Sequence, residues 1–228
     1  MKQKMKGEVK TNNRKESGNM KEKVVLKSVH PEKYPDLVIE CRVIQNAEIG
    51  AYLEEIRANG AESFYAYKSA PVLARPGKVG EEIKTTLITI VDGKEYILGE
   101  EDGVVKERSV QTDNGEVMMS DYVITNNNST SNEQYIVKAE KFMKTYSHIG
   151  YHHLEHQFIF TPVYESRLLT QVPENVIIMT SWGAPAVCLA GSYIVTYDAA
   201  SNDYNTIERG AFESTYTVEG PAVVRKKN

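Results

Sequence analysis

Four of the five histidines of the chain lie in one short segment, SHIGYHHLEHQF, residues 147–158. Imidazole nitrogens bind divalent metals, and His152, Glu155 and His156 spell H-x-x-E-H, the inverted form of a zinc-peptidase motif. In that motif two histidines hold the metal and the glutamate activates a water molecule. The segment from His148 to His156 therefore predicts one kind of chemistry, a metal-dependent hydrolase.

A second interpretation asks only for metal binding. His148, His152 and His156 are spaced by four residues, which on a helix would present their rings to zinc or another divalent ion from one face. Both interpretations need a helix, whereas Gly150 and the β-prone FIFTPV leave room for little more than one turn. The third interpretation is a polar linker with partly solvated histidines, and the local sequence favours it.

Aromatic residues supply the other candidates. The chain has 14 Tyr against five Phe and one Trp, and tyrosine suits strands and half-wet surfaces where its hydroxyl finds a partner. Tyr122, Tyr193 and Trp182 are the candidates for stacking on a small ligand. Core packing is the alternative for all three, and for Trp182 an interface anchor is a further one. No catalytic residue is assigned, because glycine-rich nucleotide loops, nucleophile elbows and paired C-x-x-C motifs are absent from the sequence.

The elements that must position these residues are mostly strands. Residues 24–29 and the alternating LVIECRVI, residues 37–44, predict strands. Residues 47–58 predict an amphipathic helix, with Asn46 as its N-cap, Ile49, Leu53 and Ile56 at helical spacing, and Asn59-Gly60 as its stop. Asp92-Gly93 lies between two β-rich runs and predicts a hairpin turn.

An internal duplication is visible in two pairs of segments. DYVIT at 121–125 matches SYIVT at 192–196, and FMKTY at 142–146 matches FESTY at 212–216. Each copy predicts a strand, a polar turn, a second strand and a short helix that carries Phe and Tyr at i and i+4. The two aromatic rings would lie on one helical face and cover a small curled sheet.

These segments resemble a family of small bacterial and phage-associated proteins named for a PGDYG motif, which precedes a valine-rich strand and a Phe-x-x-x-Tyr ending. Residues 189–216, LAGSYIVTYDAASNDYNTIERGAFESTY, carry the better match, and residues 118–146 the weaker one. The proline of the motif is absent from both copies. The resemblance implies a fold and a bacterial or phage origin, and it implies no activity.

Charge separates the N-terminus from the remainder. Residues 1–23 contain eight Lys or Arg and three Glu, a net charge of +5. Because the whole chain has a net charge of −4, residues 24–228 carry −9. A disordered basic tail is expected, and Met20 is an alternative start because the codons for Lys15-Glu16 can encode a ribosome-binding sequence. The acidic body repels phosphates, which argues against nucleic acid as its partner.

Cys41 and Cys188 lie inside apolar runs and are expected to be buried, reduced thiols on strands. No apolar run approaches the roughly 18 residues of a membrane span, and the N-terminus lacks the apolar core of a signal peptide. A cytoplasmic protein without a membrane partner is therefore expected.

The expected fold class is α+β and mainly β. An N-terminal strand-helix segment precedes two related small β units, each with a short C-terminal helical cap, and the expected units span 24–150 and 151–228. The favoured function is a non-enzymatic accessory or binding protein, with an unknown protein partner, a small ligand or a second copy of the chain as its partner. The alternatives are a small-molecule or nucleotide-binding protein with a cleft between the copies, and the metal-dependent hydrolase.

Overall fold

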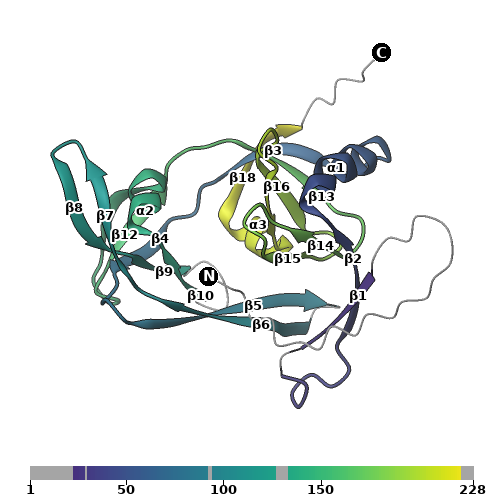
Figure 1. The fold of residues 1–228 in the computed structure, drawn as a ribbon, viewed down its shortest axis with the longest axis horizontal. Helices are drawn as coiled ribbons and strands as arrows, with labels where there is room; N and C mark the ends of the chain where they lie inside the picture. The colour runs from purple at the N-terminus through teal and green to yellow at the C-terminus, as the bar shows by residue number, and fades with distance from the viewer. Residues whose placement is uncertain (1–22, 29, 92–93, 127–132, 222–228) are drawn as a thin grey trace.

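The structure is a computed structural model that describes residues 23–28, 30–91, 94–126 and 133–221 (Figure 1). These residues are mainly β, as the sequence predicts, and they include three α-helices and one short 3-10 helix. Their strands form one four-stranded sheet, two five-stranded sheets and two long hairpins. The predicted basic tail, up to residue 22, and the predicted Asp92-Gly93 turn lie outside these ranges.

Sheet A joins the N-terminal segment to the C-terminal half of the chain. Both predicted N-terminal strands are present and pair antiparallel, and the second pairs in parallel with a strand more than a hundred residues later. Cys41 and Cys188 are buried in this sheet as free thiols, as predicted. The strand order is β1 (Lys23–Lys27), β2 (Val38–Ile44), β14 (Val176–Met179) and β15 (Pro185–Cys188).

The predicted helix is α1 (Ile49–Ala58), and a 3-10 turn, η1 (Asn46–Glu48), precedes it. Ile49, Leu53 and Ile56 are buried, together with Tyr52, as helical spacing requires. Asn46 is not the N-cap that the sequence suggested, because it lies inside η1 and Glu48 is the residue that caps α1. The side-chain amide of Asn46 donates to the carbonyl of Asn202 at 2.9 Å. The helix packs between sheet A and one face of sheet B, so its apolar side chains contact both sheets.

Sheet B has five strands, and helix α3 (Arg209–Thr215) covers the face opposite to α1. Phe212 of this helix contacts Tyr193 and Phe64, with ring centroids 4.3 and 5.4 Å away. The strand order is β17 (Asp203–Ile207), β16 (Tyr193–Asp198), β13 (Arg167–Gln171), β3 (Ser63–Lys68) and β18 (Tyr216–Pro221).

Sheet C also has five strands, and helix α2 (Ala139–Thr145) covers one of its faces. The other face packs against the hairpin of β5 (Glu82–Val91) and β6 (Lys94–Val104), through a cluster that contains Ile83 and Val123. A second hairpin pairs β7 (Glu107–Thr112) with β8 (Gly115–Ser120). The strand order is β10 (Glu133–Val137), β9 (Tyr122–Asn126), β4 (Val72–Pro76), β12 (Gln157–Pro162) and β11 (Tyr146–His152).

The chain crosses between the five-stranded sheets twice. It leaves sheet B after β3, builds the whole of sheet C between residues 72 and 162, and returns to sheet B at β13. The expected boundary between residues 150 and 151 therefore falls inside β11, and β3 completes a sheet whose other strands follow residue 166. The sequence division missed this because strand pairing joins segments that are distant along the chain.

Candidate functional site

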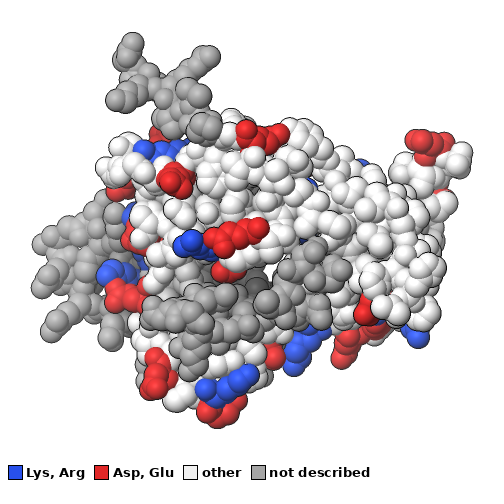
Figure 2. Space-filling model, turned by 180° about the vertical axis from the view of Figure 1, so that it is seen from behind, with Lys and Arg blue, Asp and Glu red and all other residues white. Residues whose placement is uncertain are grey.

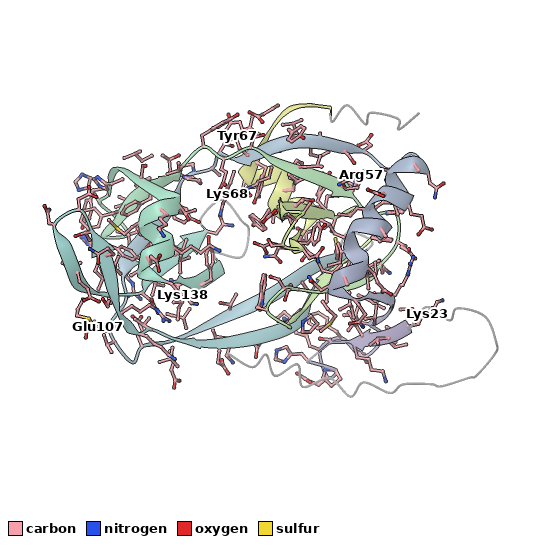
Figure 3. All side chains as sticks on the ribbon, turned by 45° about the horizontal axis from the view of Figure 1, so that its top comes forward. Lys23, Arg57, Tyr67, Lys68, Glu107 and Lys138 are labelled. Atoms are coloured by element: carbon pink, nitrogen blue, oxygen red, sulfur yellow. The ribbon has the colours of Figure 1, made fainter. Side chains whose placement is uncertain are left out.

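The two crossings place polar aromatic and basic side chains between sheets B and C. Figure 3 shows Lys68 at this place, between the two halves of the molecule. Hydrogen bonds, ring contacts and mutual electrostatic effects connect six residues there, which we call the junction cluster. It consists of Lys68, Tyr135, Tyr146, Arg167, Tyr197 and Tyr216.

Two tyrosines of the cluster follow the short helices. Tyr146 is the first residue of β11 and Tyr216 the first of β18, so each lies just past the helical face on which the sequence placed it. Each ring nevertheless stacks on the phenylalanine four residues earlier. The centroid distances are 5.1 Å to Phe142 and 5.6 Å to Phe212. The helix ends thus position both tyrosines against a buried ring.

Strand register explains why the basic residues share a surface with these rings. Lys68 pairs with Tyr216 across β3 and β18, and Arg167 pairs with Ala66 across β13 and β3. Since alternate residues of a strand point to one face, Ala66 and Lys68 lie on the same side of the sheet. Ala66 belongs to the core under α3, so the basic side chains extend this helix-covered face toward sheet C.

Lys68 links the two sheets. Its half-buried side chain comes from sheet B, yet its Nζ donates to the hydroxyl of Tyr135 at 3.4 Å and lies 6.0 Å from the ring centroids of Tyr135 and Tyr146 in sheet C. The hydroxyls of these tyrosines are 3.5 Å apart. Among the described residues no carboxylate forms an ion pair with Lys68. An ammonium group has three donors, so this one can still take an anion.

Arg167 is held differently. Its guanidinium lies 4.9 Å from the ring centroid of Tyr197, and its Nη1 donates to the Tyr197 carbonyl at 3.0 Å. Its Nη2 forms a close ion pair with Glu165. The charge of Arg167 is thus already compensated, and its role is to fix the Tyr197 ring.

Burial favours the protonated phenols of Tyr197 and Tyr216. It is the main cause that raises the pKa of Tyr197 and of Tyr216, and the neighbouring phenols add to the effect at both residues. The positive charge of Arg167 lowers the pKa of both tyrosines, but this effect is smaller than that of burial. Tyr197 is 38% exposed, so the cluster reaches the surface at this residue. The arrangement offers hydroxyl donors and one available cation, without a group suited to accept a proton at neutral pH.

The three aromatic residues singled out in the sequence lie in three different places. Tyr122 stacks on Phe142 in sheet C at 3.8 Å, and Tyr193 is buried under α3 in sheet B. Trp182 is 61% exposed in the turn between β14 and β15. The described contacts bring none of these rings together, and the two tyrosines belong to cores. Their assignment to a common ligand site stays a prediction without structural support.

Both metal interpretations require a helix at His148 to His156, and that expectation is wrong. Residues 146–162 form a β-hairpin instead, with a bulge between His148 and Gly150 and a tight turn before Gln157. His148 contacts the rings of Phe158 and Phe160, each at 5.4 Å. His152 Nδ1 accepts from the amide of Glu155 at 3.2 Å, and the residue at the turn, His156, has φ 50°. The β-branched and aromatic residues of FIFTPV favour a strand, and this preference outweighs the helical spacing of the histidines.

No three His, Cys, Asp or Glu side chains gather closely enough to hold a metal ion within the ranges that the structure describes. The candidate zinc ligands His148, His152 and His156 are therefore not assembled as a ligand set. None of the helices in the same ranges has the length and apolar character that a membrane crossing requires.

Sequence reasoning missed Lys68, Tyr135, Arg167 and Tyr197. Lys68 ends a strand in FYAYKSAP, and Arg167 begins one, so each looks like an ordinary surface charge. Only the pairing of β3 with β13 and β18 brings them beside the repeated tyrosines. Tyr146 and Tyr216 could be singled out from the sequence, because each ends a Phe-x-x-x-Tyr segment.

Comparison with known proteins supplies no family for this arrangement: no protein-family model, curated protein or solved structure matches the chain. The charge on one face of the molecule does not single out a partner class either. On the face drawn in Figure 2, acidic and basic side chains are scattered, and wide areas between them carry no charge. The junction cluster is therefore the feature on which a function can be argued.

Proposed function

We propose that sheets B and C, each with its helix, are two copies of one duplicated unit. The support is that the strand orders correspond and that the register agrees over most paired residues. Tyr122 pairs with Val137 as Tyr193 pairs with Ile207, and Thr125 pairs with Leu73 as Thr196 pairs with Leu168. Unrelated sheets have no reason to share a register in two strand pairs.

One irregularity agrees as well, in the edge strands, whereas the register shift between Thr196 and Asp198 of β16 has no counterpart in β9. Tyr146 pairs with Pro162 and Tyr216 with Lys68, and each edge strand has its register shift after the third residue, before Gly150 and Gly220 respectively. A bulge adds one unpaired residue and turns the strand. Its occurrence at the same step in both copies favours common descent over chance.

Hydrogen bonds at the helices follow the same plan. The carboxylate of Asp121 accepts from the amide of Ala139 at 3.2 Å, and the hydroxyl of Ser192 accepts from that of Arg209 at 3.3 Å. In both copies the residue before the first hairpin strand therefore holds the start of the following helix. A backbone hydrogen bond at the ends of β12 and β3 also occurs in both sheets. The amide of Val163 donates to the carbonyl of Thr145 at 2.7 Å, and the amide of Ser69 donates to the carbonyl of Thr215 at 2.9 Å.

We infer that the chain is a non-enzymatic binding protein and that its junction cluster binds a small ligand. The ligand class is a molecule with a phosphate or carboxylate group beside a planar ring, of which a nucleotide is an example. The observation that carries this proposal is Lys68, a half-buried cation that donates to the Tyr135 hydroxyl, lies near the Tyr146 ring and makes no ion pair among the described residues. The anionic group would accept a hydrogen bond from Lys68, and the planar ring would pack against the tyrosine rings.

Binding fits the cluster better than catalysis. A general base must be unprotonated near the working pH, whereas burial raises the pKa of Tyr197 and Tyr216 above their usual range. Protonated phenols act as hydrogen-bond donors to an anion. The arrangement thus supplies orientation and charge complementarity, which are the requirements of a binding site.

Isothermal titration calorimetry with adenosine monophosphate, adenosine and inorganic phosphate tests this proposal. We expect the monophosphate to bind more tightly than either part. Lys68→Met should lower its affinity at least about tenfold, because a charge-assisted hydrogen bond contributes about 1.5–3 kcal/mol. Lys78→Met is the matched control, since Lys78 is exposed in the turn before β5.

Three results would contradict the proposal. One is no binding of any of these anions, and another is an equal loss of affinity in Lys68→Met and Lys78→Met. Turnover of the bound monophosphate, followed by chromatography, would contradict the non-enzymatic assignment. Benzoate in place of the monophosphate separates a preference for carboxylate from one for phosphate.

A further inference from the structure

The face of sheet B opposite to the one that carries Lys68 is only partly covered. Helix α1 covers one end of it, where Arg57 donates two hydrogen bonds to the hydroxyl of Thr170, at 2.7 and 2.9 Å. Consecutive residues of a strand point to opposite faces, so Tyr67 points away from Lys68 (Figure 3). Tyr65 lies on the same face as Tyr67 and is exposed. The end of this face beside β18 is therefore open to solvent.

A carboxylate lies at this open end. Glu219 is the unpaired residue of the bulge in β18, just before Gly220, which pairs with Tyr65. Its Oε1 accepts a hydrogen bond from the hydroxyl of Tyr164, and its Oε2 accepts one from the hydroxyl of Ser166. Both donors are neutral, so they fix the position of the carboxylate without compensating its charge.

Tyrosine rings adjoin this carboxylate. The ring of Tyr164, whose hydroxyl donates to Glu219, is exposed, and its centroid lies 4.8 Å from that of the Tyr67 ring. Beside Tyr65, a Cβ on Gly220 would meet no atom within 4 Å among the described residues. A small molecule can therefore reach the carboxylate and the rings together. We call Tyr65, Tyr67, Tyr164 and Glu219 the outer tyrosine site.

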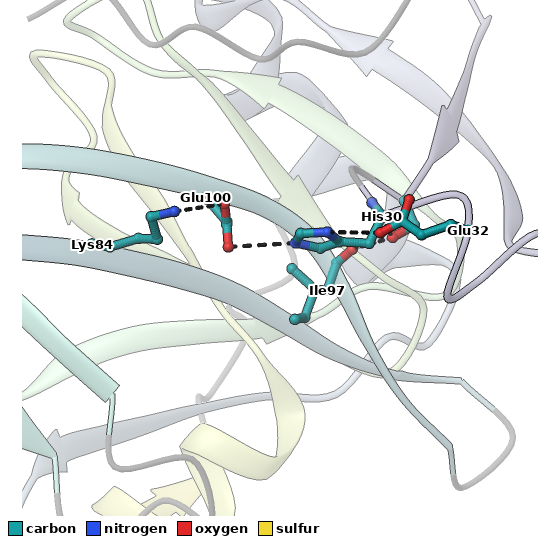
Figure 4. Close-up of polar contacts among 6 residues, drawn as sticks. His30, Glu32, Lys84, Ile97 and Glu100 are labelled. Carbon is teal, nitrogen blue, oxygen red and sulfur yellow. Dashed lines mark hydrogen bonds and ion pairs between the residues drawn. The ribbon is translucent and has the colours of Figure 1, made fainter.

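The charge of Glu219 differs from that of other carboxylates in having no basic partner. Glu100 illustrates a compensated carboxylate, since one of its oxygens contacts Lys84 Nζ at 3.2 Å and the other lies 3.4 Å from His30 Nε2 (Figure 4). Glu219 forms no ion pair within the ranges that the structure describes. The hydrogen bonds from the two hydroxyls, that of Ser166 first, hold the pKa of Glu219 below its ordinary value of 4.5 against a smaller effect of burial. Glu219 is therefore an anion at neutral pH.

Sheet C has the same bulge without these residues. Its unpaired bulge residue is Ile149, followed by Gly150, which pairs with Ile159. The Cδ1 of Ile159 lies 3.8 Å from the place of a Cβ on Gly150, so an apolar side chain fills the space that is open in sheet B. Thr161 occupies the step at which Tyr67 lies in sheet B. The bulge thus forms without a carboxylate or an aromatic ring, and folding alone does not require them.

We propose that the outer tyrosine site binds a small quaternary ammonium compound, of which choline is an example. The face of an aromatic ring attracts such a cation, and the methyl groups of the cation pack on the ring. Glu219 supplies the opposite charge. A metal ion does not fit, because calcium takes several oxygen ligands, whereas the described contacts place here one carboxylate whose two oxygens already accept hydrogen bonds. The junction cluster lies on the other face of sheet B and, through Lys68, would take a ligand of the opposite charge.

Nuclear magnetic resonance titration of the protein with choline tests this proposal. The comparison ligand is the uncharged analogue of choline that has carbon in place of nitrogen. We expect choline to bind at least about threefold more tightly than this analogue, because only the cation gains from the rings and from Glu219. The amide signals that shift should belong to β3, β18 and the residues around Tyr164.

Glu219→Gln and Tyr164→Leu should each lower the affinity for choline about two- to fivefold, as one exposed charge pair or one ring allows. Glu140→Gln is the matched control, because Glu140 is an exposed carboxylate on α2 that pairs with Lys144, and it should leave the affinity unchanged. Thermal melts check that each variant folds, and Tyr164→Leu keeps the test available if Glu219→Gln does not.

Three results would overturn the proposal. One is the absence of saturable shifts with choline, and another is equally tight binding of the uncharged analogue. The third is an equal affinity for choline in Glu219→Gln, Tyr164→Leu and Glu140→Gln.

Discussion

Sheets B and C have the same strand order and a short helix over one face, and they differ in what covers the other face. Helix α1 and sheet A cover sheet B, whereas the β5–β6 hairpin covers sheet C. Under the helices, both carry a Phe–Tyr stack. At the crossing, Lys68 pairs with Tyr216 where Pro162 pairs with Tyr146. The shared residues build a frame, and the residue proposed to bind an anion stands where the two sheets differ.

Removing the helix aromatics tests the shared frame and should have the largest effect. Phe142 is 1% exposed and Phe212 is 7% exposed. We expect Phe142→Ala and Phe212→Ala each to lower the free energy of unfolding by about 3–5 kcal/mol, since each leaves a cavity among stacked rings. Urea denaturation followed by circular dichroism measures both. A loss below about 1 kcal/mol at either site would show that this helix is not the cover of its sheet.

The residues that hold the helix starts should distinguish sheet C from sheet B. Asp121 is 1% exposed and accepts from Arg108 Nε at 2.7 Å, from the Lys106 amide at 3.2 Å and from the Ala139 amide. Ser192 accepts from one amide, and α3 also has Glu208 as a capping side chain.

We therefore expect Asp121→Ala to lower the free energy of unfolding by about 3 kcal/mol, because it leaves a cation and two amides without their acceptor. Ser192→Ala should cost about 1 kcal/mol, as for a single cap. The same urea titrations compare them. Equal losses would mean that the two helices are anchored alike and that the Arg108 contact adds nothing.

The smallest effect is expected from zinc. Residues 146–162 form a hairpin in which His148 and His152 already contact rings and backbone, so we expect the melting temperature to change by less than about 1 °C with excess zinc. Differential scanning fluorimetry measures it. Stoichiometric zinc retained after dialysis, and lost in the double variant His152→Ala with His156→Ala, would reinstate the metal interpretation.

Local patterns predicted the parts of the fold that short stretches determine. The helix at α1, the strand-turn-strand-helix order after residues 121 and 192, and the buried cysteines all follow from periodicity within about a dozen residues. Pairing between distant strands has no local signature, and the same pairing assembles Lys68 with the tyrosines.

The most direct test of the account is a crystal structure of the protein with 8-bromoadenosine monophosphate, in which anomalous scattering from bromine marks the ring. The account predicts a phosphate oxygen at hydrogen-bond distance, about 3 Å, from Lys68 Nζ, with the base against Tyr135, Tyr146, Tyr197 or Tyr216. The bromine signal should vanish in crystals of Lys68→Met. A ligand bound away from the crossing of sheets B and C, or one that remains in place in Lys68→Met, would contradict it.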